Sequence, residues 1–229
     1  MDNSDNQSSF WPSYVDIMTT LFAIMLVLFV VSYSRFKIKE HELMKLAQKY
    51  EEIKSIYQAV ENIDSTYFEF NQEYVKHIFK LQVTYKTGKF NLNELRGDEL
   101  ETDLLRKKII EAGKEIEATI LNLQANDSIK QDIKYLVVIE GQASADGYYS
   151  DEYRNNDVLS YQRALYLNRF WKEEAGIDFS SMDKCELVIS GSGEKGVPRN
   201  IENEENNQRF LIHIVPVIGN IKFEDEQIR

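Results

Sequence analysis

The hydrophobic and polar positions along the chain divide it into an apolar segment, a heptad segment and a region of alternating strand and helix patterns. The apolar segment, Tyr14 to Tyr33, holds roughly 20 residues, the length that an α-helix needs to cross the hydrocarbon of a bilayer. The ten residues before Trp11 contain aspartates and no basic residue, unlike a cleaved signal peptide. We therefore predict an uncleaved transmembrane helix over residues 14–34, after a tail over residues 1–13.

A heptad pattern follows the apolar segment. Apolar residues recur there at alternating steps of three and four between charged neighbours: Leu43, Leu46, Tyr50, Ile53, Tyr57 and Val60. Such spacing is typical of a coiled coil, and neither proline nor glycine interrupts the chain between Pro12 and Gly88. We predict a helical coiled-coil linker over residues 35–77 that joins two copies of the chain. The alternative is an amphipathic helix that packs on the chain's own soluble domain.

Beyond this linker, strand and helix patterns alternate. Strand patterns cover residues 78–85, 135–141, 185–191 and 209–215, and helical patterns cover residues 98–124 and about 156–174. This alternation predicts an α+β sandwich in which helices cover one face of a mixed sheet.

The predicted membrane segment contains one charged residue, Asp16. An ionised carboxylate is unfavourable in hydrocarbon, so an acid at this depth is a candidate for ion or proton transport. Thr19 and Thr20 follow on the same helical face, where their hydroxyls can steer an ion to the carboxylate. The alternative is an interfacial position near the helix start, where the helix dipole favours Asp16 and Trp11 joins the interfacial aromatic belt.

Composition excludes several classes of function. The formal net charge of −11 argues against a nucleic-acid partner, because binding phosphates needs a basic face. The single cysteine and three scattered histidines have no metal-ligand spacing. No arrangement of Ser/His/Asp, Cys/His or paired carboxylates has recognisable catalytic spacing. We therefore expect neither an enzyme nor a bound cofactor.

The segment Tyr14–Leu21 resembles the aspartate-containing membrane signature of the B subunits of ion-driven flagellar stators, the MotB-like proteins. In that family the aspartate carries the coupling ion, and a ring of multi-span MotA-like subunits surrounds a dimer of B helices. The resemblance implies that Asp16 carries an ion, H⁺ rather than Na⁺, and that the chain forms a homodimer with a MotA-like partner.

A second resemblance covers residues 78–217. Gly141, Ala145–Gly147, Asn156–Ala164, Gly191–Gly193 and Asn207–Phe210 follow the order and spacing of the OmpA-like peptidoglycan-binding domain. It implies that this domain spans residues 78–217 and that residues 218–229 form a C-terminal tail.

In that family an aspartate and an arginine bind the charged ends of the diamino acid in the wall's stem peptide. The arginine maps onto Arg163, a forked cation suited to a carboxylate. Ser144 replaces the aspartate, and we expect Asp146 to contact the same amine instead. The predicted peptidoglycan-binding set is Ser144, Asp146, Asn156, Leu159, Ser160, Arg163 and Arg209.

Some members of this set also have a purely structural interpretation. Asn156 is expected to cap the second helix whether or not a ligand binds, whereas Ser160 is expected to add a hydroxyl to the carboxylate site beside Arg163. Leu159 alternatively belongs to the core, and Arg209 alternatively braces the start of its strand.

Together the two resemblances imply the B subunit of a MotA/MotB-like motor in the bacterial inner membrane, with a cytoplasmic N-terminus and a periplasmic wall-binding domain. The acidic tail and extended heptad helix depart from flagellar members and resemble the MotB-like membrane subunit of the Zorya anti-phage defence system. A flagellar-type stator subunit and a passive tether between membrane and wall remain alternatives. Arg35, Lys37 and Lys39 follow the span, and by the positive-inside rule alone they favour the opposite topology.

Overall fold

The computed structural model describes residues 10–61, 63, 65–125 and 133–217. Its described residues form two units, residues 10–51 and residues 52–217. The first unit is part of one long helix, α1 (Phe10–Glu61), which carries Pro12 in its first turn, where proline is tolerated. In the described part of the chain, α1 alone is long and apolar enough to cross a membrane, by length and composition. The predicted tails are described only at residues 10–13.

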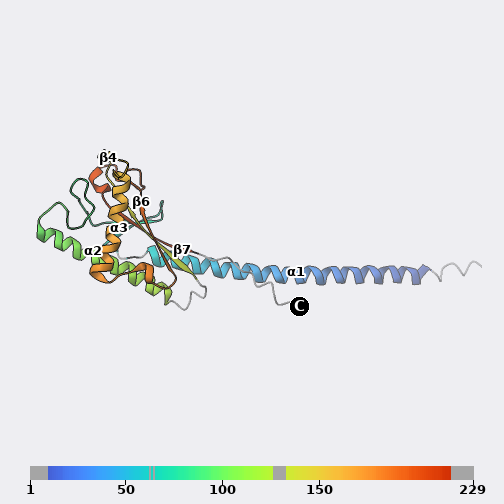
Figure 1. The fold of residues 1–229 in the computed structure, drawn as a ribbon. Helices are drawn as coiled ribbons and strands as arrows, with labels where there is room; N and C mark the ends of the chain where they lie inside the picture. The colour runs from blue at the N-terminus through green and yellow to red at the C-terminus, as the bar shows by residue number, and fades with distance from the viewer. Residues whose placement is uncertain (1–9, 62, 64, 126–132, 218–229) are drawn as a thin grey trace, which may run out of the picture. The chain divides into compact units, whose positions relative to one another are not determined.

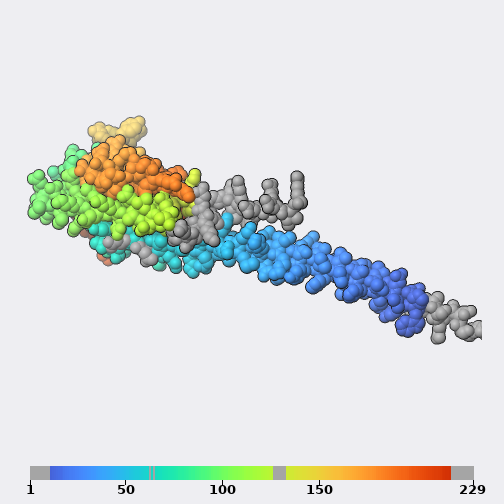
Figure 2. Space-filling model, turned by 90° about the horizontal axis from the view of Figure 1, so that it is seen from below, coloured from blue at the N-terminus to red at the C-terminus, as the bar shows by residue number. Residues whose placement is uncertain are grey.

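The second unit contains a five-stranded mixed sheet in the order β1-β2-β7-β3-β6. Two of its strands, β6 and β7, are labelled in Figure 1. Its strands are β1 (Phe68–Asn71), β2 (Lys76–Phe79), β3 (Lys134–Gly141), β6 (Cys185–Gly191) and β7 (Phe210–Val217). β3 and β6 are parallel, and β7 pairs antiparallel with both β2 and β3. A separate hairpin, β4 (Tyr149–Asp151) and β5 (Arg154–Asn155), stands out from the surface in Figure 2.

Two long helices, α2 (Glu99–Gln124) and α3 (Asn156–Ala175), pack with the sheet, and two short 3₁₀ helices follow, η1 (Phe179–Ser181) and η2 (Glu204–Asn207). α2 begins at the cap residue Asp98, whose side chain accepts a hydrogen bond from Glu101 N at 2.7 Å. α2 and α3 meet where Trp171 Nε1 donates to Ile109 O at 2.7 Å.

One face of the sheet lines the core. Val137 and Ile139 of β3 and Ile212 of β7 are fully buried in the same cluster as Trp171, whereas Val188 of β6 is exposed. The predicted fold class, an α+β sandwich with helices on one face of a mixed sheet, is confirmed.

Two glycines allow α3 to lie directly on the ends of the parallel strands. Gly141 and Gly191 face each other in register at the ends of β3 and β6. A Cβ added at Gly141 would lie 2.1 Å from Ser160 O, and one at Gly191 would lie 2.4 Å from Tyr161 N. The loops that leave both strands are therefore held against the first half of α3.

The prediction of a helical linker up to residue 77 was wrong at its C-terminal end. The helix ends at Glu61, and β1 and the start of β2 lie inside the predicted linker. The strand predicted at residues 78–85 is shorter and earlier, since β2 ends at Phe79 and Tyr85 forms an isolated bridge with Leu95.

The residues of the predicted heptad pattern are divided between the two units. Its first members, Leu43, Leu46 and Tyr50, are exposed. In the second unit, Val60 is buried together with Ile56, which is not part of the predicted heptad pattern. The alternative of packing on the chain's own domain therefore applies to the last turns of α1, because the core of the second unit covers them.

Candidate functional site

Asp16 lies on the exposed surface of α1, and the two threonines after it bond to the helix backbone. Thr19 Oγ1 donates to Val15 O at 2.5 Å, and Thr20 Oγ1 donates to Asp16 O at 2.6 Å. Serine and threonine hydroxyls in helices commonly form this bond to the preceding turn. In this conformation the hydroxyls serve the backbone rather than the carboxylate, and their role in ion transfer remains a prediction.

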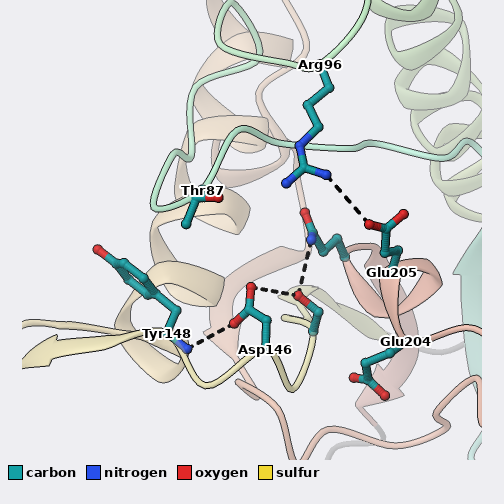
Figure 3. Close-up of a pocket in the computed structure, with 8 residues that line it drawn as sticks. Thr87, Arg96, Asp146, Tyr148, Glu204 and Glu205 are labelled. Carbon is teal, nitrogen blue, oxygen red and sulfur yellow. Dashed lines mark hydrogen bonds and ion pairs between the residues drawn. The ribbon is translucent and has the colours of Figure 1, made fainter.

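A pocket of about 390 Å³ lies in the second unit (Figure 3). Three loops form it: the one after β2, the one after β3 and the segment that contains η2. Its lining residues are Thr87, Arg96, Ser144, Asp146, Tyr148, Glu204, Glu205 and Gln208. Within the described residues, no group of three or more His, Cys, Asp or Glu side chains is placed to hold a metal ion.

A chain of hydrogen bonds fixes Asp146 in the pocket wall. Gln208 Nε2 donates to Ser144 Oγ at 3.1 Å, and Ser144 Oγ donates to Asp146 Oδ2 at 3.3 Å (Figure 3). The other oxygen, Asp146 Oδ1, accepts from Tyr148 N at 3.0 Å and from Asn156 Nδ2 at 3.2 Å. Asp146 is itself exposed, so its carboxylate is oriented by the fold and still open to a ligand.

The charges that line the pocket are mainly negative. Arg96 Nη1 lies 3.6 Å from Glu205 Oε1, and both side chains are largely exposed. Glu204 accepts a hydrogen bond from Ala145 N at 2.6 Å, and this bond, the largest cause, lowers the pKa of Glu204. Together with Asp146, the lining carries three carboxylates and one guanidinium. Glu204 is ion-paired with Arg199 outside the lining, and Glu205 with Arg96, so Asp146 is the lining carboxylate best placed to attract a cationic group.

Arg163 is buried behind this pocket rather than in its lining, with 4% of its surface exposed. Its guanidinium carbon lies 4.3 Å from the centroid of the Tyr85 ring, and its Nε donates to Lys89 O at 3.2 Å. Its Nη1 has no hydrogen-bond partner among the described residues. Burial lowers the pKa of Arg163, while Tyr85 and Asp146 act in the opposite direction. Asp146 is thus close enough to Arg163 to favour its charged form.

The side chains of Ser160, Leu159 and Arg209 make contacts within the second unit. Ser160 Oγ donates to Asp157 O at 2.7 Å and accepts from Gly193 N at 2.9 Å, so it joins α3 to the loop after β6. Leu159 is buried.

Arg209 braces the loops on either side of its strand. Its Nε donates to Gln142 Oε1 at 2.9 Å, and its Nη2 donates to Pro198 O at 2.8 Å. These contacts match the structural interpretation of Arg209.

The prediction that Asn156 caps α3 was wrong, because its neighbour Asn155 is the cap. Asn155 has extended backbone angles (φ −144°, ψ 176°), and its Oδ1 accepts from Val158 N at 3.0 Å. Asn156 is the first residue of the helix, and its amide donates to Asp146 and, at 3.5 Å, to Glu194 Oε2. Asn156 therefore orients the carboxylate of the pocket.

Sequence reasoning missed Tyr85, Arg96, Glu205 and Gln208. Tyr85, Arg96 and Gln208 lie outside the named helices and strands and Glu205 lies in η2, and no local spacing indicates that residues 85–96 and 204–208 meet. Two signals were available. Gln208 lies inside the motif Asn207–Phe210, and Tyr85 is an aromatic residue at the end of a predicted strand, which by itself predicts burial and no site.

A comparison with protein-family profiles and one with curated protein sequences found no match. Among solved structures, the chain is similar to the periplasmic domain of Helicobacter pylori MotB, with 14% identity, a TM-score of 0.39, and coverage of 61% of this chain and 81% of that one. It is also similar to the cell wall anchor of the T6SS from Pseudomonas aeruginosa, with 15% identity, a TM-score of 0.38, and coverage of 68% and 92%. A putative MotB like protein from Desulfovibrio vulgaris has 18% identity, a TM-score of 0.35, and coverage of 73% and 94%. Likenesses at these scores carry no argument about function.

Proposed function

We propose that this chain is the B subunit of a MotA/MotB-like motor in the bacterial inner membrane, anchored by its soluble domain to peptidoglycan. The observation that carries the wall-binding part is the arrangement of Arg163 and Asp146. A buried guanidinium with a free N–H lies behind a pocket whose wall holds an oriented, exposed carboxylate. Opposite charges placed in this way match a zwitterionic diamino acid.

In the proposed complex the amine of the stem peptide's diamino acid binds Asp146 in the acidic pocket. The neighbouring carboxylate of the ligand binds Arg163, whose planar fork suits two oxygens. Ser144, which stands where the resembling family has its aspartate, keeps Asp146 in place. The site is therefore built differently from the one that the sequence resemblance implies, with the acid two residues later.

The proposed motor function rests on Asp16, the one acid in an otherwise apolar span. Transport requires a carboxylate that alternates between neutral and ionised forms, H⁺ rather than Na⁺ being the expected ion. Such a group needs partner helices around it. We propose a homodimer through the exposed apolar residues Leu43, Leu46 and Tyr50 of α1, surrounded by MotA-like multi-span subunits.

We place this motor in anti-phage defence of the Zorya type, because the acidic tail and the long helix after the span depart from the flagellar pattern. Neighbouring genes test this choice. A MotA-like gene beside helicase or nuclease genes supports defence, whereas motility genes support a flagellar stator. The proposed topology has its own test, since a reporter fused after Arg229 should be active in the periplasm and inactive in the cytoplasm.

Sedimentation with purified peptidoglycan sacculi tests wall binding by the full chain in detergent. We expect Arg163→Ala to abolish co-sedimentation, since the ligand's carboxylate loses its cation. Asp146→Asn should weaken it without unfolding the protein, because Asp146 is exposed. The matched control is Arg169→Ala, which removes an exposed arginine from the same helix and should sediment like wild type. Wild-type sedimentation of both Arg163→Ala and Asp146→Asn would refute the proposed wall site.

The alternative of a passive tether predicts a different result. A tether depends on Arg163 but not on Asp16, whereas a motor subunit depends on both. A fully active Asp16→Asn variant would therefore favour the tether.

A further inference from the structure

Two buried residues that contact each other in the second unit each carry a hydrogen-bond donor without a partner. The two donors are Tyr85 Oη and Arg163 Nη1, and no described residue accepts a hydrogen bond from either. Tyr85 is 1% exposed, and its ring lies against the guanidinium at 4.3 Å. Buried polar groups without partners are unfavourable, so a pair of them at one place indicates a group that the free protein lacks.

The charge of the Arg163 guanidinium indicates which kind of ligand group would bind beside Tyr85. The described residues give the guanidinium the Lys89 carbonyl and the Tyr85 ring, but no carboxylate in ion-pairing contact. A buried cation without a counterion is costly. Burial raises the pKa of Tyr85, so its hydroxyl remains a donor at neutral pH. Two unpartnered donors on residues in contact, one of them charged, suit an oxyanion.

We propose that Tyr85 Oη and Arg163 Nη1 bind the two oxygens of one carboxylate of the wall peptide, so that Tyr85 is a binding residue. This inference rests on the proposed wall-binding function and names a second protein group for its carboxylate. The amine of the same ligand residue binds Asp146 on the pocket side.

An irregular hairpin covers the proposed carboxylate site. Its base is closed by the bonds from Arg96 N to Thr84 O at 2.9 Å and from Lys86 N to Glu94 O at 3.2 Å. Its tip contains Gly88, with φ of +70°, and the Lys89 carbonyl that accepts from Arg163. Because Arg163 is almost fully covered, the tip must move for a carboxylate to enter. Arg163 contacts this tip by a hydrogen bond at 3.2 Å, and Phe90 of the tip contacts Tyr166 of α3 with 6.4 Å between ring centroids, so both contacts must open.

The test is Tyr85→Phe in the full chain, which keeps the ring against the guanidinium and removes only the hydroxyl. The probes are the tripeptide L-alanyl-γ-D-glutamyl-meso-diaminopimelate and the same tripeptide with its free diaminopimelate carboxylates amidated, titrated by calorimetry in detergent. We expect Tyr85→Phe to weaken binding of the acid about 10-fold, the loss of one hydrogen bond to a charged group. It should change binding of the amide less than about 2-fold. Tyr135→Phe is the control, because it removes the hydroxyl of another buried tyrosine at the start of β3, outside the pocket lining, and it should bind both probes like wild type.

The outcomes separate this inference from the proposed function. Equal affinity of Tyr85→Phe and wild type for the acid, with binding lost in Arg163→Ala, overturns the role of Tyr85 and leaves the wall site standing. Absence of wild-type binding to both probes and to sacculi overturns the proposed function as well. Thermal unfolding gives an independent check, because removal of an unpartnered hydroxyl should not lower the melting temperature. A marked decrease would show that the hydroxyl serves the fold, and it would also overturn the inference.

Discussion

Glu140 offers a quantitative test of how a buried charge cluster stabilises the second unit. On β3 its side chain points away from the core-facing Ile139, as strand alternation requires. Its Oε2 accepts a hydrogen bond from Lys76 Nζ at 2.9 Å and lies 2.9 Å from His213 Nε2. Burial raises the pKa of Glu140, but hydrogen bonds from His213, Ser192 and Lys76 outweigh it and lower the pKa from 4.5 to about 2.

The direction of the pH dependence follows from this pKa. Because the pKa is lower in the folded than in the unfolded protein, the stabilisation is complete above about pH 4.5 and is lost as the pH falls towards 2. The difference between the two pKa values corresponds to about 3 kcal/mol at neutral pH. About 2 kcal/mol of this is lost by about pH 3. Glu140→Gln should therefore lose about 2 kcal/mol less stability than wild type between pH 7 and pH 3.

Urea unfolding of the full chain in detergent, followed by tryptophan fluorescence, measures this difference. The chain has two tryptophans, and Trp11→Phe leaves Trp171, which is fully buried in the core, as the probe. Glu186→Gln is the matched control, since it removes the same charge from an exposed position on the neighbouring strand. If Glu140→Gln and Glu186→Gln had the same pH dependence, the Glu140 cluster would not contribute to stability as reasoned.

Further predictions concern other parts of the chain. Asp16→Asn should abolish ion-dependent activity in cells while Asp16→Glu retains part of it, with unchanged membrane levels on immunoblots as the control. Gly141→Ala should lower the free energy of unfolding by about 2 kcal/mol or more, measured as above, because its Cβ would lie 2.1 Å from a carbonyl oxygen of α3. Asn155→Ala should cost about 1 kcal/mol through loss of the helix cap, and stability equal to wild type would contradict the assigned cap. Leu46→Cys in a Cys185→Ser background should form a disulfide-linked dimer on oxidation, seen by non-reducing electrophoresis, and a monomer only would argue against the proposed homodimer.

Much of the fold could be predicted from the sequence where a pattern was long and regular. The predicted strand at residues 185–191 has the same bounds as β6. The predicted helices differ from α2 and α3 by about one residue, at the start of α2 and at the end of α3. β1 was missed because four residues with two aromatic side chains are too short to show a period. The start of β2 depends on its pairing with β7, as in His77 with Ile212, a contact between segments far apart in the sequence. Only tertiary structure reveals such a contact.

The candidate site was predictable in part for the same reason. Asp146 lies in the motif Ala145–Gly147 and Arg163 in the motif Asn156–Ala164, so sequence alone could nominate both. The sequence could not show whether the Ser160 hydroxyl binds a ligand or another part of the protein, because its donor, Gly193 N, lies on a loop far along the chain. The cap was ambiguous because Asn155 and Asn156 are adjacent and have the same side chain.

The position of β7 in the sheet constrains the order in which the second unit can fold. β7 is the last strand of the described chain, yet it lies in the interior of the sheet between β2 and β3. Until Phe210–Val217 has been synthesised, the β1–β2 hairpin and the β3–α3–β6 segment have no strand to join them. Such long-range pairing makes folding slow relative to helix formation. The segments before β7 therefore stay without their complete sheet until β7 has been synthesised, and β7 is the strand that completes the second unit.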